Sequence, residues 1–482
     1  MAAEVEEQML VPMHQRRNRS GEEAATVAED PSIDTDKLSY EIFSILESKF
    51  LFGYDDPELW STRVPPLAAT APAEASSFKN QRGKVCVLCI DGGGGCGMRG
   101  ILPGKALAYL EQAIRTKSGD PVARISDYFD VAAGTGIGGV FAAMLFATRD
   151  GARPLFRGED TWRFLADRGK RLFRKAPPSS SSSPGLFVRC LFPGGGASTT
   201  TAAMEKAMKE AFGESLTLKD TVKPVLIPCY DLRNSAPLVF SRADALESES
   251  FDFRLWEVCR ATWAELGRFE PAEITSVDGA TACVGVDGGL AMSNPAAAAI
   301  THVLHNKQEF PFVRGVEDLM MLSLGCGEAG GGATPVVAET EYRKLRRWGP
   351  REWAQPIARI AANGAADLVD HAVALAFGQC RNSNYLRVQA DVSSMRRCSV
   401  EEVDHDGSPG NVKLLLEAAE AMLRQKNVES VLFGGKMTRE QSNMEKLDWF
   451  AGELVLEHER RSCRIAPTVA FKQPIPKSTS KS

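Results

Sequence analysis

One short stretch, residues 128–145, constrains the fold more than any other, because it joins a strand to a helix with almost no loop. Its sequence, YFDVAAGTGIGGVFAAML, begins with a short apolar run that is typical of a buried strand. From Ile137 onward the apolar residues recur at helical spacing, and only Gly134-Thr135-Gly136 lies between. Side chains resist the backbone angles of so sharp a reversal, which explains the glycines. The stretch predicts strand, turn and helix within an α/β domain.

The same spacing is that of a nucleophile elbow, G-x-S-x-G, in which a serine at the tip of the turn presents its hydroxyl above the sheet. Here the five residues are Gly134-Thr135-Gly136-Ile137-Gly138, so Gly136 occupies the serine position. The scaffold of the motif is present and its nucleophile is absent. Taken alone, the stretch favours a tight connection without chemistry.

A second glycine-rich loop follows the apolar run Val85–Ile90 and precedes a helix that contains Pro103. Such a loop presents N–H groups at a positive helix end, which makes an anion site. Three interpretations compete: a dinucleotide motif, a P-loop and an oxyanion hole. Gly95-Cys96-Gly97-Met98-Arg99-Gly100 fits the first only weakly, and Lys105 lacks the Ser or Thr that a P-loop places next.

A third stretch lies far downstream, where the expected strand 282–286 ends in Asp287-Gly288-Gly289 and is followed by Asn294-Pro295 and an alanine-rich helix. Asp287 is therefore expected on a loop at a strand end. A lone Asp-Gly-Gly is a common turn and means little by itself.

Together, in this order, the three stretches resemble the patatin-like phospholipases, whose D-G-G-G-x-R-G loop, G-x-S-x-G elbow and D-G-A/G aspartate form a site without histidine. The glycine at the elbow and residues 34–56 look like the plant subgroup whose elbow has become G-x-G-x-G. The resemblance implies a patatin-like α/β fold, with a central, mainly parallel sheet between helices in a three-layer arrangement related to that of α/β-hydrolases.

The resemblance also implies roles for individual residues. Asp287 is the expected general base, with Gly288 and Gly289 beside it, and Gly136 is the empty nucleophile position in the elbow of Gly134, Thr135 and Gly138. The oxyanion hole is expected among the residues of the glycine loop: Gly92, Gly93, Gly94, Gly95, Gly97, Arg99 and Gly100. This loop is three residues longer than the family pattern, so it aligns either at residues 91–94 or at residues 95–100, and the spacing to the next helix favours the Arg99 side.

The implied activity is hydrolysis of acyl esters in membrane glycerolipids, both phospholipids and galactolipids, without a cofactor. A water oriented by Asp287 is expected to replace the serine, with Thr135 a minor candidate because its side chain should point away from the tip. The alternative is a non-catalytic lipid-binding protein that acts through partners, and the family is associated with plant growth and defence.

Composition limits the partners and the compartment. The 482 residues carry a formal net charge of −5, which gives no general attraction to nucleic acid. The eleven scattered cysteines suggest reduced thiols in a cytoplasmic protein. Cys86 and Cys89 are expected to point to opposite faces of a strand, in the core. No apolar run is long enough to span a bilayer, so membrane contact is expected to be peripheral, at the plasma membrane.

A basic and aromatic segment supplies the best candidates for that contact, namely Arg346, Arg347 and Trp348. No metal site is predicted, because His302 and His305 are expected to pack or to meet solvent and the remaining histidines are isolated. The expected organisation is a disordered N-terminus (1–32), a helix and linker (33–80), the patatin-like domain (81–395) with a flexible insertion (176–198), a C-terminal helical region (396–470) and a tail (471–482).

Overall fold

The structure is a computed structural model that describes residues 83–92, 96–173, 197–327, 345–390, 403–431, 435–462 and 467–472. The expected N-terminal segments 1–32 and 33–80 lie outside these residues, and the expected domain 81–395 is described from residue 83. Most of the insertion 176–198 and most of the tail also lie outside them.

A mixed, mostly parallel sheet of eight strands forms the centre of the molecule, in the order β5-β6-β3-β2-β1-β7-β8, with β4 also paired to β3. Strands β8, β7, β1, β2 and β3 run parallel, whereas β4, β5 and β6 are joined by antiparallel pairs. The strands are β1 (Val85–Ile90), β2 (Val131–Gly134), β3 (Val225–Asp231), β4 (Ala236–Ser241), β5 (Ala272–Thr275), β6 (Ala282–Val286), β7 (Leu319–Leu324) and β8 (Tyr385–Val388).

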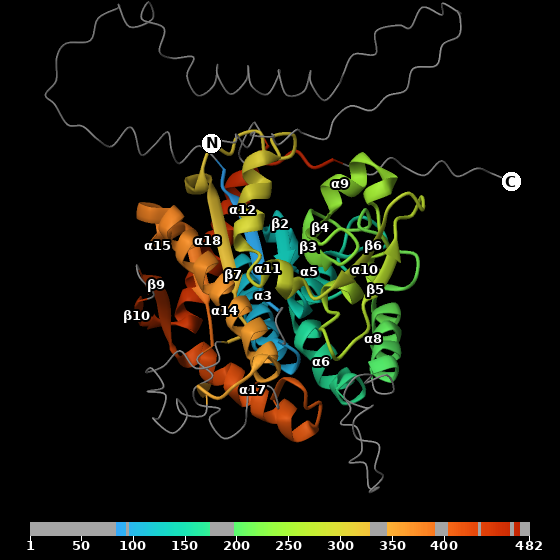
Figure 1. Cartoon of the computed structure of the whole chain (residues 1–482). Helices are drawn as coiled ribbons and strands as arrows, with labels where there is room; N and C mark the ends of the chain where they lie inside the picture. The colour runs from blue at the N-terminus through green and yellow to red at the C-terminus, as the bar shows by residue number, and fades with distance from the viewer. Residues whose placement is uncertain are drawn as a thin grey trace, which may run out of the picture.

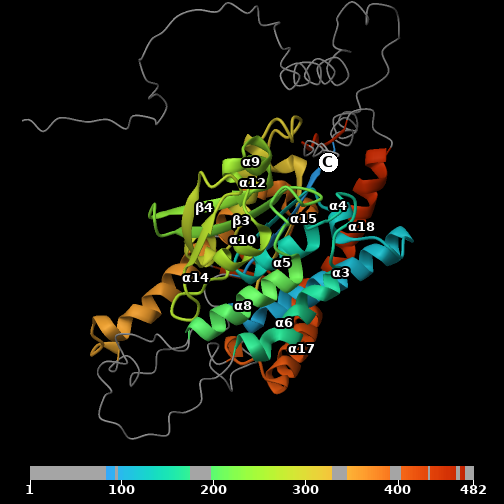
Figure 2. The ribbon, with the colours of Figure 1, turned by 90° about the vertical axis from the view of Figure 1, so that its right-hand side faces the viewer.

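Helices cover both faces of this sheet, which gives three layers (Figure 1 and Figure 2). The larger core lies under α3 (Ile101–Ser118), α5 (Ile137–Phe146), α6 (Gly158–Leu172), α8 (Ala197–Phe212), α10 (Leu255–Thr262), α17 (Pro409–Arg424) and α18 (Asn443–Ser462). The smaller core lies under α12 (Ala296–His305) and α14 (Pro350–Phe377). Cys86 belongs to the first core and Cys89 to the second, as the alternation along β1 predicts.

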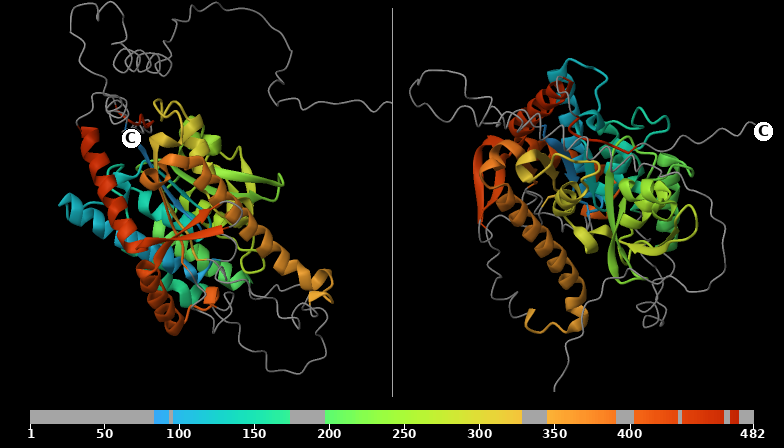
Figure 3. Two further views of the ribbon diagram at one scale, coloured as in Figure 1. Left: turned by 90° about the vertical axis from the view of Figure 1, so that its left-hand side faces the viewer. Right: turned by 90° about the horizontal axis from the view of Figure 1, so that it is seen from above.

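Shorter elements complete the fold. They are the helices α4 (Ile125–Tyr128), α9 (Arg242–Glu247), α11 (Gly288–Met292) and α15 (Arg381–Asn384), and the 3₁₀ turns Met98–Gly100, Glu249–Phe251, Val316–Asp318 and Gly378–Cys380. A two-stranded sheet of β9 (Lys426–Val431) and β10 (Gly435–Ser442) lies between α17 and α18 in the chain. It forms the arrows that Figure 3 shows beside α18.

The expected α/β class, the strands 85–90 and 282–286 and the helix after Gly136 are confirmed. The expected C-terminal helical region 396–470 contains α17 and α18, but it also contains the strands β9 and β10. The polar sequences of β9 and β10 give no apolar alternation, so the hairpin is not evident from periodicity. None of the helices in the described ranges has the length and apolar character needed to cross a bilayer.

A buried ion pair attaches the last helix to the start of the sheet. Arg461 of α18 donates hydrogen bonds of 2.7 and 2.6 Å to the two carboxylate oxygens of Asp130, whose side chain is fully buried. The same carboxylate accepts a hydrogen bond from the main-chain N–H of Cys86 in β1. Asp130 therefore holds α18, β1 and the segment before β2 together.

Replacing Arg461 tests this attachment. Arg461→Ala leaves the buried carboxylate of Asp130 without its bidentate partner, so we expect a loss of about 3–5 kcal/mol in the free energy of unfolding. Urea denaturation followed by circular dichroism measures it. Arg460→Ala, which removes an exposed arginine from the same helix, should change stability by less than about 0.5 kcal/mol. Equal effects of the two substitutions would contradict the assignment.

Candidate functional site

The elbow has the backbone of a nucleophile turn although its tip carries no side chain. Gly136 lies between the end of β2 and the first residue of α5, with φ of 55° and ψ of −124°. L-residues rarely adopt this φ, so glycine is favoured here and any other residue is strained. The predicted strand, turn and helix are thus present, with the turn confined to Thr135 and Gly136.

The glycine loop and the elbow meet backbone to backbone. The N–H of Thr135 donates to the carbonyl of Ile90 (3.1 Å), and the N–H of Ile137 donates to the carbonyl of Gly92 (3.3 Å). A Cβ atom at Gly92 would lie 2.4 Å from the carbonyl oxygen of Thr135, and one at Gly138 would lie 2.2 Å from the carbonyl oxygen of Ile90. No side chain fits at either position, so these glycines are required by the contact between the two turns.

Thr262 is a residue of the site that sequence reasoning missed. Its hydroxyl is fully buried, accepts a hydrogen bond of 2.9 Å from the N–H of Gly136 and donates one of 2.6 Å to the carbonyl of Pro228. Thr262 therefore fixes the peptide at the tip of the elbow against β3. It comes from the end of α10, and nothing in the pattern around it distinguishes it from a core threonine.

Asp287 lies at the start of α11, next to the elbow. A Cβ atom at Gly288 would lie 2.5 Å from the hydroxyl oxygen of Thr262 and 3.2 Å from the Thr135 side chain. The segment that follows Asp287 therefore packs against the elbow residue Thr135 and against Thr262, which binds the elbow. Asp287 is 7% exposed, and its carboxylate accepts a hydrogen bond of 2.8 Å from the N–H of Gly289. The carboxylate is thus buried and oriented, with Gly289 as the donor that fixes it.

Thr135 carries a hydroxyl at the elbow, but this group is already engaged. Its Oγ1 donates to the carbonyl of Met292 at the end of α11 over 2.7 Å, and the side chain is completely buried. The hydroxyl therefore joins the elbow to α11.

The later half of the glycine loop serves as an anchor. The guanidinium of Arg99 donates to both carboxylate oxygens of Asp404 over 2.8 and 2.9 Å and to the carbonyl of Gly327. The main-chain N–H of Arg99 also donates to Asp404, and that of Gly100 donates to the carbonyl of Gly97. Burial raises the pKa of the Asp404 carboxyl, and Arg99 opposes this shift.

These contacts change the expectation drawn from motif spacing. That spacing favours the Arg99 side of the loop for the oxyanion hole, but the amides of Arg99 and Gly100 are used within the protein. Gly97 packs against the carbonyl of Asp404 and the ring of Phe173. The remaining candidates from that expectation are Gly92, Gly93, Gly94 and Gly95, of which the last three lie outside the described residues.

A disulfide ties this loop to the end of β7. Cys96 and Cys326 are joined across 230 residues, with their Cα atoms 6.5 Å apart. The expectation that the cysteines are reduced is therefore wrong for this pair, whose proximity depends on the neighbouring positions of β1 and β7 in the sheet. Cys86, Cys89, Cys229, Cys259, Cys283 and Cys380 are free thiols.

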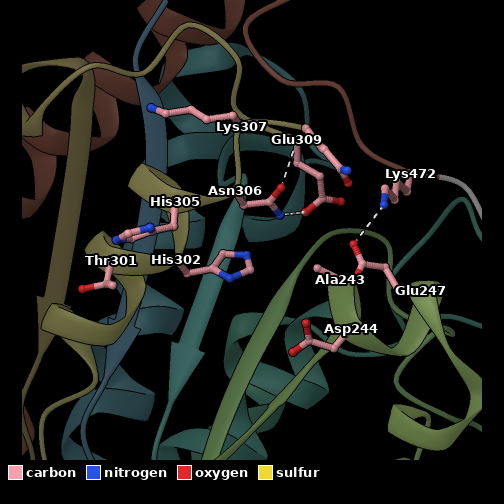
Figure 4. Close-up of a pocket in the computed structure, with 11 residues that line it drawn as sticks. Ala243, Asp244, Glu247, Thr301, His302, His305, Asn306, Lys307, Glu309 and Lys472 are labelled. Atoms are coloured by element: carbon pink, nitrogen blue, oxygen red, sulfur yellow. Dashed lines mark hydrogen bonds and ion pairs between the residues drawn. The ribbon is translucent and has the colours of Figure 1, made fainter. Parts of the chain in front are cut away.

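A polar pocket of about 460 Å³ lies at the other end of α12 from the elbow. Figure 4 shows that its charged side chains pair with one another: the ammonium of Lys472 contacts Glu247, and the amide of Asn306 contacts Glu309. Burial lowers the pKa of His302 in this pocket to about 4, so the imidazole is neutral at pH 7. His302 packs edge-on against Phe310, and His305 is exposed, as expected.

A second pocket, of about 530 Å³, is more apolar and lies along the segment that follows Asp287. Met292, whose carbonyl holds Thr135, is part of its wall. Its other walls come from β3, β4, α12 and α14, through residues such as Leu226, Val239 and Val369.

Two of the histidines that are predicted to be isolated, His405 and His458, contact other side chains. His405 faces Glu265, with 3.3 Å between Nε2 and Oε1, and stacks on Phe173, while His458 packs against Tyr128. Within the described residues, no group of three His, Cys, Asp or Glu side chains is arranged to hold a metal ion. The membrane candidates Arg346 and Arg347 are exposed, and the ring of Trp348 contacts that of Trp353 edge-on.

Gly136→Ala tests the backbone of the elbow. Because φ at this position is 55°, we expect the added Cβ to cost about 1–3 kcal/mol of folding stability. The control is Gly364→Ala within α14, where nothing lies within 4 Å of the added Cβ and stability should rise by about 0.5–1 kcal/mol. Thermal unfolding of both variants measures the difference, and a neutral or stabilising Gly136→Ala would refute the strained turn.

Comparison with known proteins places the chain in a family. The family model described as "Patatin-like phospholipase" matches residues 88–300, which include all three glycine turns. Patatin-like protein 6 of Arabidopsis thaliana is 62% identical, over 95% of this chain and 91% of that protein. Patatin-like protein 7 of the same plant is 61% identical, over 95% of this chain and 88% of that protein. Probable inactive patatin-like protein 9, also from Arabidopsis thaliana, is 40% identical, over 88% of this chain and 93% of that protein. The chain therefore belongs to the plant patatin-like proteins, a family of lipid acyl hydrolases.

Proposed function

We propose that the protein is a slow acyl hydrolase of membrane glycerolipids, in which a water molecule takes the place of the absent serine hydroxyl. The observation that carries the proposal is the meeting of three segments at one point. Gly92 packs on the elbow, the N–H of Gly136 binds Thr262, and Gly288 packs on Thr262 and Thr135. The segment that bears Asp287, the tip of the elbow and the start of the glycine loop are thus neighbours, which supports a shared site.

The proposed reaction is direct hydrolysis. Asp287 accepts a proton from a water at Gly136 while the water oxygen forms a bond to the ester carbonyl carbon. In this proposal, peptide N–H groups of the first part of the glycine loop, from Gly92 onward, stabilise the resulting oxyanion. The intermediate then breaks its bond to the alcohol oxygen, which receives the proton from Asp287, so that one ester and one water give one acid and one alcohol.

The expected rate follows from the missing nucleophile. In serine hydrolases, loss of the nucleophile costs about a million-fold in kcat, yet oxyanion stabilisation and binding still leave about a thousand-fold over the uncatalysed reaction. Turnover is therefore expected to be slow and measurable.

The substrate class rests on the surroundings of the site. The apolar pocket of about 530 Å³ along residues 291–294 has the size and character that suit an acyl chain. Phospholipids and galactolipids both present such chains as esters, and both remain candidates.

A non-catalytic lipid-binding role is the second candidate. Gly136 supports it, and so does the name of one relative, which is called probable inactive. In that case the same pocket would hold an acyl chain without cleaving it, and the protein would act through partners.

Ester hydrolysis by the purified protein separates the two candidates. We expect measurable turnover of p-nitrophenyl butyrate that falls at least about 10-fold in Asp287→Ala, because the general base is lost. Gly136→Ser should raise kcat by about 100-fold or more, since it restores a nucleophile on a backbone already shaped for it.

A control variant makes this result interpretable. Asp278→Ala removes a carboxylate from an exposed turn and should leave turnover unchanged. Absent turnover in the native chain, together with no gain in Gly136→Ser, would favour the lipid-binding role. Turnover that persists in Asp287→Ala would exclude Asp287 as the base.

We also propose that the protein meets its substrate as a peripheral visitor to a bilayer, from the cytoplasmic side, through the start of α14. This helix extends away from the sheet at its first residues (Figure 2). The exposed side chains of Arg346 and Arg347 beside Trp348 combine positive charge with an aromatic ring, a composition that suits the interface of an anionic membrane.

Charge reversal tests the membrane contact. Arg346→Glu with Arg347→Glu should reduce sedimentation with phosphatidylserine vesicles by about 10-fold or more, at about 1 kcal/mol for each basic residue near the surface. The control is Lys413→Glu with Arg424→Glu on α17, an equal charge change at exposed residues of another helix. Equal binding by the two double variants would remove the proposal.

A further inference from the structure

A buried arginine lies at the centre of a group of polar side chains behind the glycine loop. Arg387 of β8 is 7% exposed, and its guanidinium contacts the carboxylates of Asp91 (2.6 Å) and Asp370 (3.1 Å). It also donates to the hydroxyl of Ser323 in β7 over 2.7 Å. One cation thus holds two carboxylates that come from segments nearly 280 residues apart in the sequence.

Each of these carboxylates belongs to a different part of the candidate site. Asp91 is the first residue of the glycine loop, and its N–H donates to the carbonyl of Leu324. Asp370 of α14 accepts a hydrogen bond of 2.5 Å from the side-chain amide of Asn294. Asn294 lies seven residues after Asp287, and its side-chain oxygen Oδ1 accepts a hydrogen bond from the main-chain N–H of Ala296, which begins α12.

The result is a continuous chain of side chains, Asp91–Arg387–Asp370–Asn294, that links the glycine loop to the end of the segment bearing Asp287. Gly325 lies beside this chain, where a Cβ atom would lie 1.4 Å from the side-chain oxygen of Gln389 and 3.0 Å from a terminal nitrogen of Arg387. Burial alone would lower the pKa of Arg387, but the facing carboxylates of Asp370 and Asp91 raise it above its ordinary value, so the guanidinium remains charged.

This arrangement differs from the other buried arginine pair of the sheet. Arg461 and Asp130 lie where β1 and β2 begin, and they hold α18 in place. Arg387 lies where β8 and its neighbour β7 end, beside the two loops that the proposed reaction uses. Burying a guanidinium among carboxylates is costly, and in this position it fixes orientation.

We propose that Arg387 is a positioning residue that sets the glycine loop and the Asp287 segment relative to each other, acting through Asp91 on one side and through Asp370 and Asn294 on the other. The inference rests on the proposed function for its catalytic consequence. Its structural consequence, the coupling of the two segments, rests on the contacts alone.

Hydrogen–deuterium exchange measures the structural consequence without any activity. Arg387→Lys keeps the charge but loses the planar fork that holds two carboxylates, so we expect about 10-fold faster exchange in peptides covering residues 90–98 and residues 287–295 together. The matched control is Arg461→Lys, the same change in the buried pair at the other end of the sheet. It should speed exchange near residues 84–86 and in α18, and leave the two loop peptides unchanged.

Kinetics on p-nitrophenyl butyrate measures the catalytic consequence. Arg387→Lys should lower kcat by about 10–100-fold, because small displacements between a base and an oxyanion site have large effects, with KM changed less than about 2-fold. Arg461→Lys should change neither. If Arg387→Lys does not fold, Asp370→Asn keeps the shape of the side chain and loses its charge. It should also lower kcat with little change in KM, by a smaller factor.

The outcomes separate this inference from the proposed function. Faster exchange in both loops in a protein that never hydrolyses the ester would uphold the coupling and remove the hydrolase. Turnover in the native chain with unchanged exchange and unchanged kcat in Arg387→Lys would remove the coupling alone. Faster exchange in only one of the two loops, or equal loop effects in Arg461→Lys, would also overturn it.

Discussion

The close approach of two peptide backbones, the glycine loop after β1 and the elbow after β2, is the contact on which the site depends. The elbow donates main-chain hydrogen bonds to the carbonyls of Ile90 and Gly92. Gly92, Gly134 and Gly138 each face a backbone atom of the other turn or of the helix that follows. Parallel neighbours bring these turns to the same edge of the sheet, and the absence of Cβ atoms lets them touch. The elbow therefore keeps the shape of a nucleophile turn although it carries no serine.

The surroundings of these turns are more rigid than a loop on a surface would be. Arg99 is bound to Asp404, Cys96 is bound to Cys326, and Asp91 is held by Arg387. Thr262 and Thr135 hold the elbow from the other side. A site built this way is preorganised, which is what stabilisation of an oxyanion requires.

Local sequence patterns were enough to predict the turns, but not what holds them. The strand 85–90, the strand 282–286 and the helix from Ile137 follow from runs and periods of apolar residues, and the glycine spacing predicts where the chain reverses. Thr262, Asp370, Arg387 and Asp404 act through partners that include residues 34 to 305 positions away in the chain, and no local pattern marks them. The β9–β10 hairpin was missed for another reason, since its polar strands lack the alternation that identifies a half-buried sheet.

The antiparallel course of β6 determines how deep the buried aspartate lies. This strand enters beyond the end of β3 and runs back along it, pairing Gly285 with Asp231 and Val286 with Tyr230, so that Gly288 arrives beside Pro228, level with the elbow. Besides these two pairs, the N–H of Leu232 donates to the carbonyl of Val284 (2.9 Å), and the carboxylate of Asp231 accepts a hydrogen bond from the N–H of Val284 (3.0 Å). A slip of one residue would move Asp287 by about 3.3 Å and turn its side chain to the opposite face. Asp231 therefore helps to hold β6 in register on β3, and with it the depth at which Asp287 lies.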